Sequence, residues 1–119
     1  MTDRTNRISA EMRKEISDIL QRDLKDPRIP ELISVVSVDL SRDFRYAKIY
    51  ISMIGNPEEK QNALEGLRSA AGFIRREIGQ RIKVHHTPEL IFEIDSSIEY
   101  GVYMSELINR TLKDDETKN

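Results

Sequence analysis

The stretch Phe44-Arg45-Tyr46-Ala47-Lys48-Ile49-Tyr50-Ile51-Ser52-Met53-Ile54 carries the clearest secondary-structure signal in the sequence. Apolar and polar side chains alternate along it, and its β-branched and aromatic residues favour extended backbone. One face of the resulting strand would carry Ala47, Ile49, Ile51 and Met53, and the other Tyr46, Lys48, Tyr50 and Ser52. This pattern predicts a strand with one face packed on helices and the other at least partly open.

Further elements are expected on both sides of this strand. The apolar run 32–40 precedes it across the short polar turn Ser41-Arg42-Asp43, which predicts an antiparallel hairpin, and 89–95 reads as a third strand. Apolar residues at helical spacing predict an amphipathic helix over 4–25. A second helical region starts at Asn56-Pro57, and Ser96 with Glu99 fits the cap of a last helix ending near Leu112.

Gly72 interrupts the second helical region, so we expect two helices joined by a kink at Ala70, Ala71 and Gly72. The expected order is helix, strand, strand, helix, helix, strand, helix. Strands adjoining long helices predict an α+β fold, a three-stranded sheet with helices on one face. We expect a single domain over 1–112 and a disordered, charged tail over 113–119.

Composition excludes several classes of site. The 119 residues contain no cysteine, which rules out disulfides, thiol nucleophiles and thiolate metal sites. No apolar run is long enough for a membrane span, and the N-terminus lacks the apolar core of a signal peptide. We therefore expect a soluble, cytoplasmic protein.

The net charge of -2 hides a strong polarity along the chain. Residues 68–86 hold five cations and one anion, whereas residues 89–119 hold three cations and eight anions. A cationic surface for a phosphate backbone is therefore possible despite the overall sum.

Two groups of basic residues are candidates for that surface. One lies on the second half of the long helical region, which is expected to continue through Lys83, and comprises Arg75, Arg76, Arg81 and Lys83. The other lies at the hairpin turn and comprises Arg42, Arg45 and Lys48, interleaved with Tyr46 and Tyr50, which could stack on bases. Two simpler interpretations remain open: the cations form a solvated surface, and the tyrosines stabilise the sheet.

Nothing in the sequence assembles a catalytic or metal site. There is no nucleophile elbow, phosphate-binding glycine loop or dinucleotide fingerprint. His85 and His86 are adjacent, which is the wrong spacing for two ligands on one helix face, and they more simply extend the basic segment. The carboxylate pairs Asp39 with Asp43 and Glu93 with Asp95 lack an evident partner, so we expect no enzyme and no cofactor.

Five separate stretches, in order, resemble the bacterial ribosome-binding factor A family. They are 4–8 (RTNRI), 25–29 (KDPRI), the hairpin pieces 41–44 and 47–50 (SRDF and AKIY), 71–75 (AGFIR) and 88–95 (PELIFEID). The similarity spans 4 to about 112. It implies a type II KH-like fold in which a kink of the form Ala-x-Gly, here Ala70-Ala71-Gly72, replaces the usual Gly-x-x-Gly loop.

The resemblance also implies a function without catalysis. Members bind the free or immature 30S subunit and its 16S rRNA, support late maturation, rRNA processing and cold adaptation, and act alongside assembly GTPases. We expect a monomer with no membrane partner. Where members often carry arginine before the last strand, this chain has His85 and His86. The expected phosphate contacts are Arg75, Arg76, Arg81, Lys83, Arg42, Arg45, Lys48, Arg4 and Arg7. The alternative is a protein-interaction module that docks a ribosome-associated protein through its open sheet face or its acidic last helix.

Overall fold

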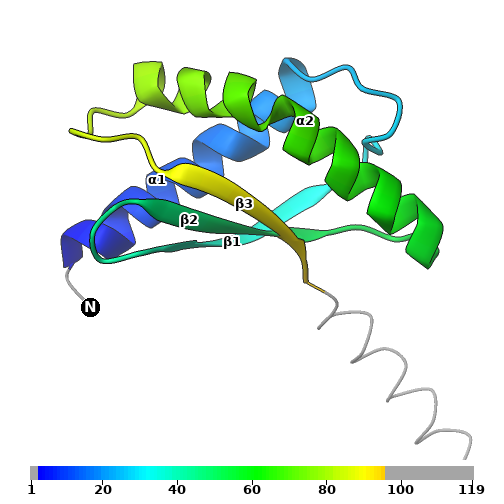
Figure 1. The fold of residues 1–119 in the computed structure, drawn as a ribbon, viewed down its shortest axis with the longest axis horizontal. Helices are drawn as coiled ribbons and strands as arrows, with labels where there is room; N and C mark the ends of the chain where they lie inside the picture. The colour runs from blue at the N-terminus through cyan, green and yellow to red at the C-terminus, as the bar shows by residue number, and fades with distance from the viewer. Residues whose placement is uncertain (1–2, 96–119) are drawn as a thin grey trace, which may run out of the picture.

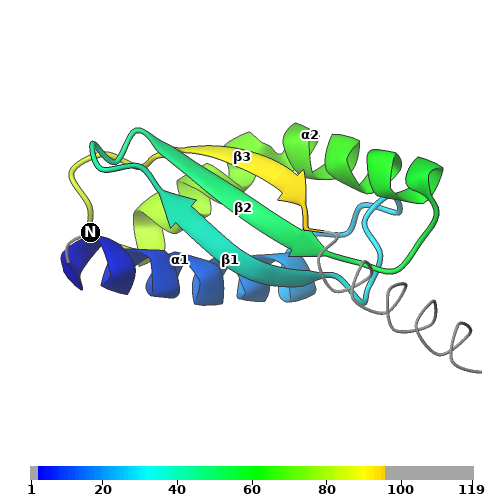
Figure 2. The same cartoon turned by 90° about the horizontal axis from the view of Figure 1, so that it is seen from below.

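The computed structural model describes residues 3–95, and the expected last helix and tail lie outside these residues. The elements are α1 (Asp3–Arg22), β1 (Ser34–Leu40), β2 (Tyr46–Ser52), α2 (Pro57–Arg81) and β3 (Glu89–Ile94). Both helices lie on one face of a single sheet, as Figures 1 and 2 show from two sides. The predicted α+β class is confirmed, and so is the placement of the two described helices on one face of the sheet.

The sheet has the order β1-β2-β3, with the strand predicted from 44–54 at its centre. β1 and β2 form the expected antiparallel hairpin, with Leu40 opposite Ala47 and Ser34 opposite Ser52. β3 runs parallel to β2, starting with Glu89 beside Tyr46. Parallel neighbours need a long crossover connection, and α2 is that connection.

The core lies between the sheet and the two helices. Every apolar side chain predicted for the packed face of β2 is buried, with Ile49 and Ile51 fully so. These side chains belong to one core with apolar side chains from α1, α2 and β3. The largest side chains with almost no exposure are Met12, Ile16, Ile19, Ile49, Ile51, Leu67, Ile74, Ile78 and Phe92. This packing fixes the helix ends relative to the strand ends.

The start of α2 agrees with the sequence pattern. The Glu59 amide donates to the Asn56 side chain at 2.8 Å, and the Asn56 amide donates to the Glu59 carboxylate at 3.1 Å. This reciprocal pair, with Pro57 next, satisfies N–H groups that the helix leaves unpaired.

The expected division of this region into two helices is wrong. α2 is one helix of 25 residues that passes through Ala70, Ala71 and Gly72 without a break, although its axis changes direction near the middle (Figure 1). Ala70 and Ala71 pack against the core, but a Cβ added at Gly72 would meet nothing within 4 Å. Close approach inside the protein therefore does not explain Gly72.

Arg81 links the two helices through carboxylates. Its guanidinium lies 2.9 Å from Asp18 and 3.1 Å from Glu15 on α1, and 2.9 Å from Asp23 just beyond α1. Glu77, one turn back on α2, is 3.7 Å away. Hydrogen bonds to Asp18 and Glu15 raise the pKa of Arg81 above its usual value. Arg81 therefore offsets part of the repulsion among four acidic side chains, and Arg22, 3.0 Å from Asp18, adds a second cation.

Substitution of two of the three glycines in α2, Gly72 and Gly66, should separate their roles. Gly72→Ala should raise the free energy of unfolding by about 0.5–1 kcal/mol, since alanine is the better helix former and has free space there. Gly66→Ala should lower it, because the new Cβ would lie 3.1 Å from Ile29 and 3.4 Å from Arg28. Urea unfolding followed by circular dichroism measures both. A destabilised Gly72→Ala variant would show that the bend requires glycine.

Removal of the Arg81 charge should weaken the contact between the helices. Arg81→Met should lower the thermal midpoint at low salt, and the deficit should shrink in high salt because repulsion among the carboxylates is screened. Arg76→Met is the matched control, since Arg76 lies on the same helix, is exposed and has no ion pair among the described residues. Equal midpoints for the two variants would contradict a structural role for Arg81.

Candidate nucleic-acid interface

Three segments that are distant in sequence meet at one end of the molecule. These are the start of α1, the turn between β1 and β2, and the connection from α2 to β3, all at the left in Figures 1 and 2. We call residues 4–7, 41–45 and 82–88 together the basic end. They contain five cations against the single anion Asp43, and the cations are Arg4, Arg7, Arg42, Arg45 and Lys83.

The hairpin turn is held by its own polar side chains. Ser41 Oγ donates to the Asp43 carboxylate at 2.8 Å and accepts from the Tyr46 amide at 3.0 Å. The Arg45 amide also donates to Asp43, at 3.1 Å. These bonds, first the one from Ser41, lower the pKa of Asp43. They leave the side chains of Arg42 and Arg45 exposed on an ordered turn, although Arg45 Nε lies 3.9 Å from the Asp43 carboxylate.

Phe44 connects the turn to the start of α1. It is the only described non-glycine residue with positive φ, at 61°. Its ring packs partly against the core, and the Arg4 guanidinium carbon lies 5.7 Å from the ring centroid, within cation–π range. Packing therefore holds a strained backbone in place, and Arg4 lies beside the turn, with Arg7 about one helical turn further along α1.

The connection from α2 to β3 is tied both to α2 and to the hairpin. Arg75 donates two hydrogen bonds to the Thr87 carbonyl, at 2.8 and 3.1 Å. The Glu89 amide donates to the Arg45 carbonyl at 2.8 Å. Arg75 thus positions this connection while its remaining N–H groups stay available in an exposed side chain. The sequence did not reveal this role, because the partner is a backbone carbonyl 12 residues away.

The predicted cations are only partly brought together. Lys83 is exposed at the basic end, but it follows the C-terminal cap of α2 rather than continuing the helix as expected. Arg76 is exposed on α2, and Lys48 is exposed on the open face of β2 opposite Asp39. Arg81 differs from these cations. Glu15, Asp18 and Asp23 accept hydrogen bonds from its guanidinium and Glu77 lies 3.7 Å away, so we do not include it among the proposed phosphate contacts.

The open sheet face is not cationic. Its charged side chains are Lys48 on β2 and the carboxylates Asp39, Glu89 and Glu93 on the neighbouring strands. A shallow hollow of about 380 Å³ lies on this face and is lined by Asp39, Ser41, Tyr46, Lys48 and Ile91. Tyr46 is exposed there, but the surrounding charge disfavours a phosphate backbone. The candidate interface is therefore the basic end, with Arg75 and Arg76 beside it on α2.

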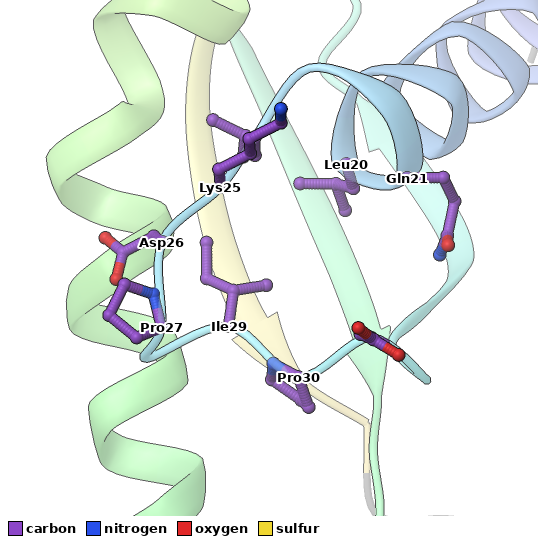
Figure 3. Close-up of a pocket in the computed structure, with 9 residues that line it drawn as sticks. Leu20, Gln21, Lys25, Asp26, Pro27, Ile29 and Pro30 are labelled. Atoms are coloured by element: carbon purple, nitrogen blue, oxygen red, sulfur yellow. The ribbon is translucent and has the colours of Figure 1, made fainter.

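A second hollow lies at the opposite end of α1, under the loop that leads to β1 (Figure 3). It encloses about 720 Å³ and has a mixed lining, with Leu20, Leu24 and Ile29 next to Lys25 and Glu31. Beside it Arg28 pairs with Asp26 at 2.7 Å, and the hydrogen bond from Arg28 lowers the pKa of Asp26. This end carries no excess of positive charge.

Two further kinds of feature, a metal site and a membrane-spanning helix, are absent from the part of the chain that the structure describes. Within residues 3–95, His, Asp and Glu side chains form no group of three suited to a metal ion. Neither described helix is long and apolar enough to cross a membrane.

Sequence comparison places the chain in a family. The family model described as ribosome-binding factor A matches residues 4–108. The ribosome-binding factor A of Acetivibrio thermocellus is 58% identical over 109 residues, covering 92% of this chain and 89% of the relative. The Caldanaerobacter subterraneus protein of the same name is 48% identical, covering 98% and 95% of the two chains.

Solved structures agree. The solution structure of a Thermotoga maritima protein is 36% identical, with a TM-score of 0.72, and covers 82% of this chain and 92% of that one. A homology model of Thermus thermophilus ribosome binding factor A, as fitted into a cryo-electron microscopy map of a 30S complex, has the same fold, with 24% identity, a TM-score of 0.61 and coverage of 74% and 91%. On its sequence and its fold, this chain belongs to the ribosome-binding factor A family.

Proposed function

We propose that the protein is a ribosome assembly factor that binds the immature 30S subunit through its 16S rRNA. The observation that carries the proposal is the basic end, where three separate segments that hold five cations and one anion lie at the same end of the molecule. Double-helical and folded RNA are bound largely through phosphates and surface shape, and each neutralised phosphate releases counterions. Family membership and the 30S complex of the Thermus relative support the choice of ribosomal RNA.

The proposed contacts fall into two sets. Arg4, Arg7, Arg42, Arg45 and Lys83 form the centre, because they surround one ordered turn. Arg75 and Arg76 extend the surface along α2, where exposed Gly72 presents bare backbone to an approaching rRNA helix. Lys48 lies at the margin among carboxylates and contributes least. Arg81 holds the helices and touches no phosphate.

Binding energy rather than bond-making would perform the work. A protein that binds one rRNA conformation more tightly than another shifts the population toward the bound conformation. Such a shift in late 16S maturation would support rRNA processing and growth in the cold, where misfolded RNA escapes slowly. Assembly GTPases are functional partners under this proposal, and the protein acts in the cytoplasm as a monomer without cofactor or catalysis.

Docking of a ribosome-associated protein on the open sheet face is the second candidate. The acidic and apolar character of that face favours a protein over RNA. Salt separates the two candidates, because binding through several phosphates weakens steeply with salt whereas an apolar contact does not.

Charge reversal at the basic end tests the first candidate. The double variant Arg42→Glu with Lys83→Glu should co-sediment poorly with small subunits. The slope of log K against log salt should fall in magnitude by about 1.5, because each phosphate that is no longer neutralised removes about 0.7–0.9 from the slope. Both side chains are exposed and have no ion pair among the described residues, so the circular dichroism spectrum should stay unchanged.

The matched control reverses two exposed lysines outside the basic end, Lys14→Glu with Lys25→Glu. It changes the net charge equally and should leave most of the binding. Equal weakening in both double variants would mean that net charge alone explains the loss of binding. Undiminished binding in the Arg42→Glu, Lys83→Glu variant would show that the basic end is not the interface.

A further inference from the structure

Two large aliphatic side chains are almost fully exposed at the far end of the open sheet face. Leu32 is 91% exposed and Ile54 is 93% exposed. Their neighbours Ile33 and Met53 are buried in the core at 4% and 5% exposure. The inside–outside alternation of β1 and β2 therefore continues past the strand ends and places Leu32 and Ile54 on the open side.

These side chains extend a wider apolar surface on the same side of the sheet. Tyr46 and Ile91 are exposed at 46% and 36%, and Tyr50 is half-buried. Both described helices lie on the other side (Figure 2). Large apolar side chains exposed together on one uncovered face, even with charged neighbours, mark a site of interaction.

The chain itself continues from the edge of this surface. The Asp95 amide donates to the Ile51 carbonyl at 2.7 Å, so β3 ends beside β2 only a few residues before Ile54. Asp95, the last described residue, therefore lies at the end of the sheet where Leu32 and Ile54 lie. The family match extends through residue 108, so most of this continuation belongs to the part of the chain that the family shares.

The sequence of this continuation needs an apolar partner. At helical spacing the charged residues of 98–112, which are Glu99, Glu106 and Arg110, fall in one narrow arc. Tyr100, Met104, Ile108 and Leu112 follow each other at intervals of four on the opposite side. Fifteen helical residues measure about 22 Å, and a seven-residue strand such as β2 measures about 23 Å.

We propose that residues 98–112 form a helix that packs its apolar side on the open sheet face, over Leu32, Ile54, Tyr50 and Ile91. The sheet would then be covered on both sides. A segment attached at Asp95 has an effective concentration in the millimolar range, which favours it over a second copy or another protein. The open face and the last helix were each a candidate docking site for a partner. In this arrangement each would bury the apolar side chains of the other.

The absence of cysteine allows a direct test on the full chain. A nitroxide attached at Ser37→Cys lies on the exposed open face, and one attached at Ser69→Cys lies on the outer face of α2. The Ser37 label should attenuate the amide NMR signals of 98–112, and the Ser69 label should leave them intact. Adding Ile54→Asp to the Ser37-labelled protein should restore part of the lost intensity.

A mixture of spin-labelled protein with isotope-labelled, unmodified protein identifies the source of any attenuation. The proposal requires that attenuation disappear in the mixture. Attenuation that persists there would assign the face to a second copy, and absent or equal effects from the two labels would leave the segment off the sheet. Either result overturns the proposal.

Discussion

The parallel pairing of β3 with β2 is the constraint on which the rest of the arrangement depends. A parallel neighbour must start at the same end of the sheet, so the chain has to return from the end of β2 to the β1–β2 turn, and α2 makes that return. α1 also starts at this end. It runs to the opposite end of the sheet, and β1 then runs from there to the β1–β2 turn. The topology thereby brings three chain segments to one place.

This convergence explains how an acidic protein can present a cationic surface. The net charge is -2, yet the basic end has five cations around one carboxylate that is itself hydrogen-bonded within the turn. The compensating acids lie elsewhere, on the open sheet face and around Arg81 between the helices. Long-range attraction of a polyanion depends on this local field rather than on the sum of charges.

Local patterns in the sequence were sufficient to predict the helices and strands. They were not sufficient to predict contacts between segments that are distant in the sequence. The alternation in 44–54 and the Asn56-Pro57 start are local and were predictable. Arg81 pairs with carboxylates and Arg75 donates to a carbonyl that only folding brings near, so charge periodicity in the sequence could not reveal either contact. Gly72 suggested a break, but the helix continues because a glycine costs only about 1 kcal/mol against the packing on either side.

Hydrogen exchange of the backbone amides, compared between free protein and protein bound to small ribosomal subunits, tests the central claim most directly. A single interface built from three segments should slow exchange together at 41–45, at 82–88 and in the first turns of α1. Residues 23–33, at the opposite end, should exchange as they do in the free protein. Protection confined to 23–33, or found at only one of the three segments, would contradict a common interface at the basic end.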